Sequence, residues 1–276
     1  MIIDSHLHVW SSDTERYPFA GKGTTEAGSA ELLLETMESA GVEKSVIVQP
    51  IHYLYDNRYV ADCLEKYPGK FSAMAIMDRH APDAVKQLEK LVTVDGFEGL
   101  RMHLSRPDDP AEWAAPDQDP IWRKAEELGA SFLSFGPAEL LPAVEPIIAR
   151  YPGVKVILDH LGGAPFDEEG PCPLLGNVLN LAKYANVYVK FTPQAGKSKE
   201  DYPLRDTHDV YQRIYDAYGP ERLMWGTDFP HILRNIGYQR GLDLFRDHLT
   251  FLDDDDKEWL FRKTALSIWK FGRSKD

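Results

Sequence analysis

The sequence has few cysteines, no long hydrophobic run and fewer basic than acidic side chains. Its 276 residues include only 2 cysteines, Cys63 and Cys172, which lie far apart and form no metal or redox spacing. A disulfide framework is therefore not expected, and a reducing cytoplasm fits best. The N-terminus lacks the features of a secretory signal, and no segment approaches the roughly 18 apolar residues of a membrane helix. We expect a cytoplasmic protein.

The charge balance limits the kinds of partner. The chain carries 44 acidic and 31 basic residues, a formal net charge of −13. Such a charge repels polyanions and argues against nucleic acid or an anionic membrane as partner. A small anionic substrate would need a local basic pocket. Hydrophobic residues at 43% and charged residues at 27% are ordinary for a globular protein.

Short apolar runs alternate with segments of helical period, which is typical of βα units around a parallel sheet. The length suits one α/β barrel, which needs about 250 residues. We therefore predict an α/β fold: a single (β/α)8 TIM-like barrel over residues 1–276, with its active site at the C-terminal ends of the strands. The predicted strands are Ile2–His8, Ser45–Gln49, Phe71–Met77, Gly96–His103, Ser131–Phe135, Val154–His160, Asn186–Thr192 and Arg222–Asp228.

Helix signals and long connections complete this frame. Gly41, Gly129 and Gly219 each follow a helical segment and precede a strand, as a left-handed helix stop does. The aspartates 253–256 predict a helix start. Three long segments follow predicted strands and are candidate lids or specificity loops: Leu104–Pro120, Leu161–Asn177 and Pro193–Thr207.

His6 and His8 stand at the end of the first predicted strand. Residues i and i+2 of a strand point to the same side, so both imidazoles can face one ion or one substrate atom. Alone, such a pair is more often structural.

Two further groups end later strands. Asp159 and His160 follow an apolar run and precede two glycines, and Asp228 ends the last predicted strand. Taken singly, His160 is nearly as well explained as a core histidine, and Asp228 as a helix N-cap with Pro230 close behind.

Together these groups change the interpretation, because they fall at the C-terminal ends of strands one, six and eight. Three histidines and an aspartate then converge on one barrel mouth. Neutral imidazoles and a carboxylate suit Zn²⁺ or Mn²⁺. A carboxylate beside a metal or a polarised carbonyl can also deprotonate water.

Candidate substrate-binding residues surround this mouth. Arg101 and His103 form a second i, i+2 pair at a strand end, and a guanidinium suits a carboxylate. An ion pair with an acidic side chain is the alternative for Arg101, and His103 could assist proton transfer. Lys190 could hold an anion or pair with Asp159 or Asp228.

Three more residues are candidates from their positions in loops. Tyr55 and Asn57 follow the second strand and suit an oxygen-rich ligand, although each is individually better explained by loop packing. His231 lies three residues after Asp228 and could orient that aspartate or contact the leaving group.

The motifs as a set resemble the amidohydrolase superfamily, in the branch called amidohydrolase family 2. The resemblance rests on the segments 3–10, 159–160 and 226–231, read as IDSHLHVW, DH and GTDFPH. The segments VQP at 48–50, YDNRY at 55–59 and GLR at 99–101 are similar to its lactonase group. That group includes 2-pyrone-4,6-dicarboxylate hydrolase and sugar-acid lactonases.

The resemblance implies that His6, His8 and His160 bind a divalent metal or directly polarise the scissile carbonyl, while Asp228 activates water and can complete the metal site. The chain lacks the carboxylated lysine and second late-strand histidine of binuclear members, so at most one metal is expected, and activity without metal stays open. The implied activity is hydrolysis of a carboxylate-bearing lactone or cyclic ester. The alternatives are a metal-dependent non-oxidative decarboxylase and a catalytically silent, ligand-binding barrel.

Overall fold

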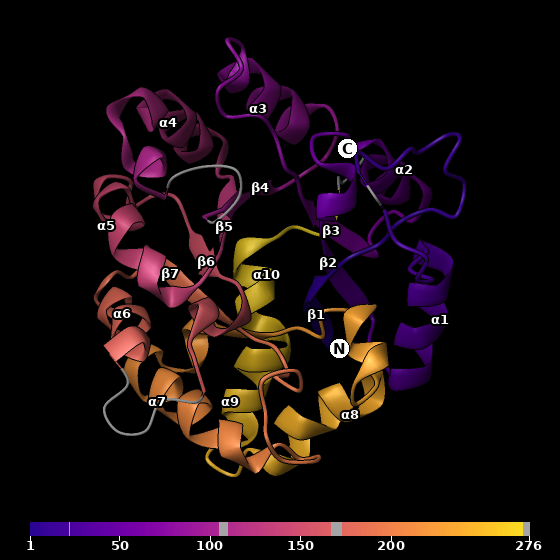
Figure 1. Cartoon of the computed structure of the whole chain (residues 1–276), viewed down its shortest axis with the longest axis vertical. Coiled ribbons are helices and arrows are strands. Elements are labelled where there is room, and N and C mark those ends of the chain that lie inside the picture. Colours follow the sequence, from indigo (N-terminus) through magenta and orange to yellow (C-terminus); the bar gives the residue numbers. More distant parts are fainter. Residues whose placement is uncertain (22, 105–109, 167–172, 273–276) are drawn as a thin grey trace.

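In the computed structural model, which describes residues 1–21, 23–104, 110–166 and 173–272, parallel strands alternate with helices (Figure 1). The predicted α/β class is confirmed, and each predicted strand is present, most of them shortened. The strands of the described residues are β1 (Ile3–Leu7), β2 (Lys44–Val48), β3 (Phe71–Met74), β4 (Gly99–His103), β5 (Ser131–Phe135), β6 (Val156–Leu158), β7 (Val187–Phe191) and β8 (Leu223–Trp225).

Strands β6 and β8 end earlier than predicted. His160 and Asp228 have φ angles of 49° and 63°, in the left-handed region. An extended strand cannot continue through such a conformation, so both residues lie just beyond the sheet. Non-glycine residues adopt it at a cost and are enriched at functional sites.

The strands form two parallel sheets, β1-β2-β3 and β4-β5-β6-β7-β8. Single bridges join the sheets at both edges. Leu7 pairs with Phe229 at one edge, where the His8 amide donates to the Phe229 carbonyl over 2.7 Å. Ala75 pairs with Leu100 at the other.

Helices cover the outside of the sheets (Figure 1). Gly41 and Gly129 end α1 and α4 in the left-handed conformation, at φ angles of 71° and 66°, as predicted. Gly219 ends α7 as predicted, but with φ 72° and ψ 160° it is outside the left-handed helical conformation. Asp253 accepts from the Asp256 amide in a capping box and begins α9, also as predicted. The helices of the described residues are α1 (Ala30–Ala40), α2 (Arg58–Lys66), α3 (Ala84–Thr93), α4 (Asp119–Leu128), α5 (Leu141–Arg150), α6 (Pro173–Asn180), α7 (His208–Tyr218), α8 (Tyr238–Asp243), α9 (Asp254–Glu258) and α10 (Thr264–Ile268).

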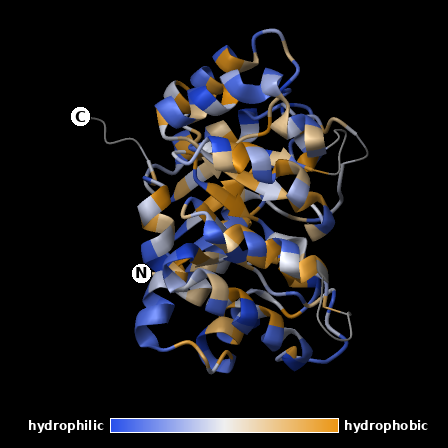
Figure 2. Cartoon of the chain, turned by 90° about the vertical axis from the view of Figure 1, so that its left-hand side faces the viewer, coloured by the Kyte–Doolittle hydropathy of each residue, from blue (hydrophilic) through white to orange (hydrophobic). Residues whose placement is uncertain are grey.

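Two hydrophobic cores hold this arrangement together. The larger fills the space between strands and helices. The smaller joins side chains from strands of both sheets to the C-terminal segment: Ile3, Val46, Val48, Met74, Leu133, Ile157, Met224, Ala265, Trp269 and Phe271. Hydrophobic residues gather on the strands and hydrophilic ones on the outer helices (Figure 2).

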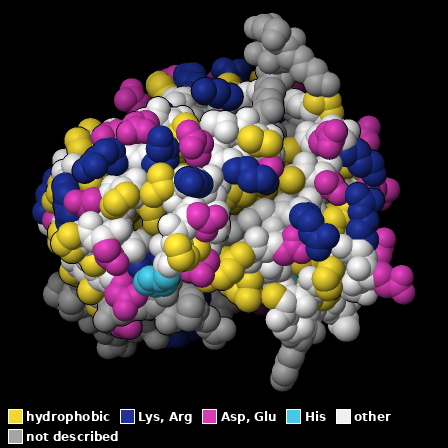
Figure 3. Space-filling view, turned by 90° about the horizontal axis from the view of Figure 1, so that it is seen from above, with side chains coloured by type: hydrophobic (Ala, Val, Ile, Leu, Met, Phe, Trp, Pro, Cys, Tyr) yellow, Lys and Arg dark blue, Asp and Glu magenta, His cyan; other side chains and the backbone are white. Residues whose placement is uncertain are grey.

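The surface carries charges of both signs. On the face in Figure 3, basic and acidic side chains are interspersed over the described residues. Among those residues, none of the helices has the length and apolar character that crossing a bilayer requires.

Candidate active site

A pocket of about 670 Å³ opens where the strands end at their carboxyl termini. His8 follows β1, Arg101 and His103 end β4, and His160 and Asp228 follow β6 and β8. Parallel strands bring their C-terminal ends to one edge, which is why residues 220 positions apart in sequence meet here.

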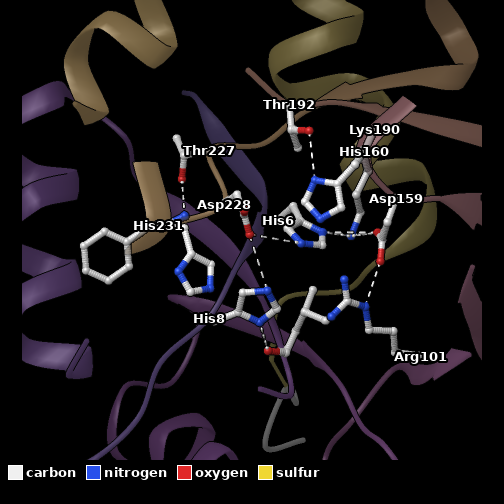
Figure 4. Close-up of polar contacts among 12 residues, drawn as sticks. His6, His8, Arg101, Asp159, His160, Lys190, Thr192, Thr227, Asp228 and His231 are labelled. Atoms are coloured by element: carbon white, nitrogen blue, oxygen red, sulfur yellow. Dashed lines mark hydrogen bonds and ion pairs between the residues drawn. The ribbon is translucent and has the colours of Figure 1, made fainter. Parts of the chain in front are cut away.

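Three side chains converge at the floor of the pocket (Figure 4). Oδ1 of Asp228 lies 3.7 Å from Nε2 of His6 and 3.5 Å from Nε2 of His8. Of the residues that the structure describes, these three form a group whose candidate ligand atoms all lie within 4.8 Å of one another. His160 is not part of that group, although its ring centroid is 4.4 Å from that of His6.

The hydrogen bond of His8 defines which of its ring nitrogens carries the proton. Nδ1 of His8 is 2.8 Å from the Val48 carbonyl oxygen, which can only accept, so the neutral ring carries its proton on Nδ1 and presents an Nε2 lone pair. Nδ1 of His6 lies 3.1 Å from Oδ1 of Asp159, an acceptor, and 3.2 Å from Nζ of Lys190, a donor. Nε2 of both rings and a carboxylate oxygen of Asp228 face one another.

This donor set fits a divalent cation. Nε2 of His6 and Oδ1 of Asp228 are buried without a hydrogen-bond partner among the described residues. Buried polar atoms are normally satisfied, and unprotonated imidazoles with a carboxylate are ligands of Zn²⁺ and similar ions. His6, His8 and Asp228 are thus the residues that could hold a metal.

Behind His6 lies a buried ionic cluster. Asp159 Oδ2 accepts from Nε of Arg101 over 2.9 Å, and its Oδ1 is 3.1 Å from Nζ of Lys190. Burial would raise the pKa of Asp159, but the charges of Lys190, His6 and Arg101 hold it well below its usual value. Burial lowers the pKa of Lys190 to about 8, so both members are charged at neutral pH. An ionised Asp159 keeps its acceptor role toward His6.

The protonation states around the pocket suit water activation. Burial would raise the pKa of Asp228, but the adjoining rings of His160, His8 and His6 outweigh it and lower the pKa. Burial lowers the pKa of His160 to about 4. At neutral pH the site therefore holds an ionised Asp228 carboxylate beside the neutral rings of His6 and His160.

A second buried carboxylate ties β1 to the segment after β8. Asp4 Oδ1 accepts from the backbone amides of His6 and Thr227, and Oδ2 accepts from the hydroxyls of Thr227 and Tyr238 at 2.6 and 2.9 Å. The two ligand-bearing segments are thereby held in register. Burial raises the pKa of Asp4 to about 6.

The structure brings most of the predicted site residues together. Arg101, His103 and His231 line the pocket with the catalytic candidates. Lys190 has no exposed surface and lies behind the pocket. It forms an ion pair with Asp159, which is one of the two roles predicted for it. The geometry gives Lys190 no access to a substrate.

Tyr55 and Asn57 are not brought to this pocket. They line a separate depression between α2 and α3. Asn57 donates to the Ile76 carbonyl oxygen and accepts from the Ile76 amide, which fixes the chain beyond β3. Their predicted substrate role has no geometric support, because the segment after β2 turns outward before it reaches them.

Several pocket residues were missed from the sequence. Trp10 follows His8 at i+2 and meets His52 in a T-shaped contact, and Phe135 ends β5 under the guanidinium of Arg101. Trp10 continues the alternation of His6 and His8, which is a usable signal. Gln194 also lines the pocket, but no sequence pattern separates it from other loop residues.

Histidines and an aspartate lie together at the C-terminal ends of parallel strands in an α/β fold. This arrangement is typical of hydrolytic enzymes. The family model described as Amidohydrolase matches residues 3–271, so the chain belongs to the amidohydrolase family.

Curated relatives carry more specific names. The chain is 24% identical over 236 residues to an L-fucono-1,5-lactonase of Burkholderia ambifaria, covering 83% of this chain and 80% of the relative. It is 23% identical over 230 residues to a 4-sulfomuconolactone hydrolase of Hydrogenophaga intermedia, covering 83% and 74%.

Solved structures share the fold. A Pseudomonas putida protein provisionally assigned as a 2-pyrone-4,6-dicarboxylic acid hydrolase gives a TM-score of 0.83 at 21% identity, covering 97% of this chain and 96% of that one. An amidohydrolase of Burkholderia multivorans with bound zinc gives a TM-score of 0.80 at 22% identity, covering 97% of this chain and 98% of that one. A 2,6-dihydroxybenzoate decarboxylase from Rhizobium is more distant, with a TM-score of 0.72 at 15% identity, covering 97% of this chain and 98% of that one.

Proposed function

We propose that this amidohydrolase hydrolyses a lactone or related cyclic ester that bears a carboxylate. The observation that carries the proposal is the convergence of His6, His8 and Asp228, of which His8 and Asp228 line the same pocket as Arg101. The curated relatives named as lactonases and lactone hydrolases support the same reaction class.

Asp228 is the water activator in this mechanism. Its carboxylate takes a proton from water, and the oxygen attacks the lactone carbonyl to form a tetrahedral oxyanion. The ring C–O bond then breaks, and the proton held by Asp228 passes to the departing alkoxide oxygen. The products are a hydroxy acid and the regenerated carboxylate of Asp228.

His6, His8 and Asp228 would hold one divalent metal, Zn²⁺ or Mn²⁺. When bound, the metal supplies Lewis-acid polarisation and lowers the pKa of water. The zinc in the Burkholderia multivorans structure supports this assignment. The proposed ligand set has three members, because His160 lies outside the group of converging ligand atoms.

Arg101 recognises the substrate carboxylate. Its Nε is committed to Asp159, and its guanidinium lines the pocket over the ring of Phe135, 4.2 Å from the centroid. The remaining guanidinium nitrogens are donors suited to a carboxylate. His103 and His231 also line the pocket and contact the rest of the substrate.

We also propose that the two sheets form one closed (β/α)8 barrel and that residues 1–276 are a single domain. The bridges at both sheet edges and the inner core shared by strands of both sheets support this arrangement. A cytoplasmic location is part of the proposal and accords with the low cysteine content.

Hydrolysis of a panel of sugar-acid, muconate-type and pyrone lactones tests the function. The protein is assayed after chelation and after addition of Zn²⁺ or Mn²⁺, with Asp228→Asn as the inactive control. Turnover of at least one carboxylate-bearing lactone that is lost in Asp228→Asn is expected. Absence of turnover under every metal condition, or carbon dioxide release from aromatic carboxylates instead, contradicts it.

A further inference from the structure

Gln194 has a fixed amide orientation at the start of the loop after β7. Its Nε2 lies 3.0 Å from the Thr192 carbonyl oxygen and 2.9 Å from Thr192 Oγ1. A carbonyl oxygen can only accept, so the amide atom facing it is the nitrogen. Gln194 is 6% exposed and therefore donates to Thr192 rather than to water.

Thr192 passes this constraint to His160. Its side chain is fully buried, and Oγ1 lies 3.0 Å from Nδ1 of His160 (Figure 4). Among the described residues, Gln194 and His160 are the hydrogen-bond partners of this hydroxyl. Gln194 is a donor, so the hydroxyl proton has only Nδ1 of His160 as acceptor. Nδ1 then carries no proton, and the neutral ring is protonated on Nε2.

His160 thus has the tautomer opposite to that of His8. His8 faces the Val48 carbonyl oxygen, an acceptor, through Nδ1 and offers an Nε2 lone pair, whereas His160 faces a donor through Nδ1 and offers an Nε2 proton to the pocket. Geometry separates them in the same way, because His160 lies outside the group of converging ligand atoms.

We propose that Gln194 and Thr192 are positioning residues that hold His160 in its Nε2–H form, so that His160 donates a hydrogen bond to the substrate carbonyl oxygen and does not bind the metal. The identity of the acceptor as a lactone oxyanion rests on the proposed function. The tautomer of His160 and the number of metal ligands do not depend on that function.

The reverse tautomer is costly at this site. A proton on Nδ1 would force the Thr192 hydroxyl to accept from both neighbours and leave its own proton without an acceptor. A buried group left without its hydrogen-bond partner is destabilising. It would also turn an Nε2 lone pair toward the developing oxyanion, which is repulsive. The hydrogen bonds from Gln194 through Thr192 to His160 therefore also favour the transition state.

The tautomer is measured first, by ¹⁵N NMR of histidine-labelled metal-free protein, with His160→Gln used for assignment. We expect His160 to show the Nε2–H pattern and His8 the Nδ1–H pattern. Thr192→Val, which keeps the shape and removes the hydroxyl, shifts His160 toward the other tautomer, and Thr192→Ser restores it. Thr36→Val is the matched control, since its hydroxyl donates to Leu32 in α1. An Nδ1–H signal in the wild type, or no change in Thr192→Val, overturns the proposal.

Metal binding supplies a readout that needs no turnover. The chelated protein is titrated with Zn²⁺ and its metal content measured after dialysis. His160→Gln is expected to bind one equivalent of Zn²⁺ with a Kd within roughly threefold of wild type. His8→Gln is expected to lose more metal affinity than the roughly 10- to 100-fold lost when a residue that hydrogen-bonds to a metal ligand is replaced. A loss in His160→Gln equal to that in His8→Gln overturns the assignment.

Turnover then tests the donor role. Removing one oxyanion donor lowers kcat by roughly 10² to 10³-fold. We expect His160→Ala to lose that much in kcat with little change in KM, and Thr192→Val to lose about tenfold or more, with recovery in Thr192→Ser. If His160→Ala loses catalytic efficiency through a raised KM and not through kcat, the donor role of His160 is overturned. If the wild type hydrolyses no lactone, the proposed function fails, and the NMR and metal titrations still decide this inference.

Discussion

Nδ1 of His6 lies 3.1 Å from Oδ1 of Asp159, and neither side chain has any exposed surface. Asp159 also pairs with Lys190 and Arg101. One buried carboxylate therefore does two things: it positions the His6 ring, and it balances two cations that the fold excludes from water.

Asp159→Asn is expected to destabilise the fold strongly. The substitution leaves Lys190 buried without its counterion, and breaking a buried pair in this way costs roughly 3–5 kcal/mol. Urea unfolding measures the loss. The double variant Asp159→Asn/Lys190→Met is expected to recover part of it, because one of the two uncompensated charges is gone and that of Arg101 remains. A double variant no more stable than the single one would contradict this account.

Arg101→Met is expected to weaken binding of carboxylate-bearing lactones. A hydrogen bond to a charged group contributes about 1.5–3 kcal/mol, which corresponds to a rise in KM of roughly 10- to 150-fold. Paired assays with a lactone acid and its methyl ester separate recognition from general damage, since the ester cannot make the charged contact. An equal loss on both compounds would remove Arg101 from the role of carboxylate receptor.

The sequence predicts the strands and the principal site residues because both depend on local pattern. His6 and His8 alternate within a strand, and Asp228 ends an apolar run, so their meeting follows once the strands are parallel. The parts that fail depend on distant contacts. Asn57 looks like a ligand-binding residue until its amide is seen to hydrogen-bond the backbone of Ile76.

The same reason explains why the sequence leaves His160 open as either a metal ligand or a residue that polarises the carbonyl. His160 has the residue type of a ligand, but the hydroxyl of Thr192 and the amide of Gln194 determine its proton position. The sequence shows these three residues without showing their hydrogen-bond directions. Of the long connections predicted as lids or specificity loops, residues 105–109 of Leu104–Pro120 and 167–172 of Leu161–Asn177 lie outside the described residues. The third, Pro193–Thr207, contributes Gln194 and Lys197 to the pocket lining.

Asp4 predicts a specific pH dependence of stability. Its pKa is raised from 3.8 to about 6 by burial, so the folded state binds the extra proton between these values. The contribution is fully present below pH 3.8 and is lost as the pH rises through 6. A shift of about two pKa units corresponds to about 3 kcal/mol.

The measurement compares wild type with Asp4→Asn, both metal-free, by urea unfolding between pH 4 and 7. Asparagine keeps an oxygen for the two backbone amides and does not titrate. The stability of Asp4→Asn relative to wild type should therefore increase by up to about 3 kcal/mol as the pH rises. A difference that stays constant with pH would show that Asp4 is not protonated in the folded state.

Metal removal is expected to lower both stability and activity. A ligand that binds only the folded state adds about 2.7 kcal/mol when present at 100 times its Kd. Addition of Zn²⁺ to chelated wild type should raise the Tm accordingly, and His8→Gln should show no such rise. A rise of equal size in His8→Gln would place the metal elsewhere in the chain.

Gly226 makes the position of His6 sensitive to one methyl group. A Cβ at Gly226 would lie 2.6 Å from Cβ of His6 and 2.8 Å from its backbone nitrogen. Backbone atoms cannot yield as a flexible side chain does, so Gly226→Ala should displace β1 at His6, cost about 1–3 kcal/mol and weaken metal binding.

Gly176→Ala is the matched control: it lies in α6 with nothing within 4 Å of its added Cβ. The control should gain up to about 1 kcal/mol from helix propensity and bind metal normally. Wild-type stability and metal affinity in Gly226→Ala would mean that the segment after β8 can move away from β1, contrary to the hydrogen bonds of Asp4 that join them.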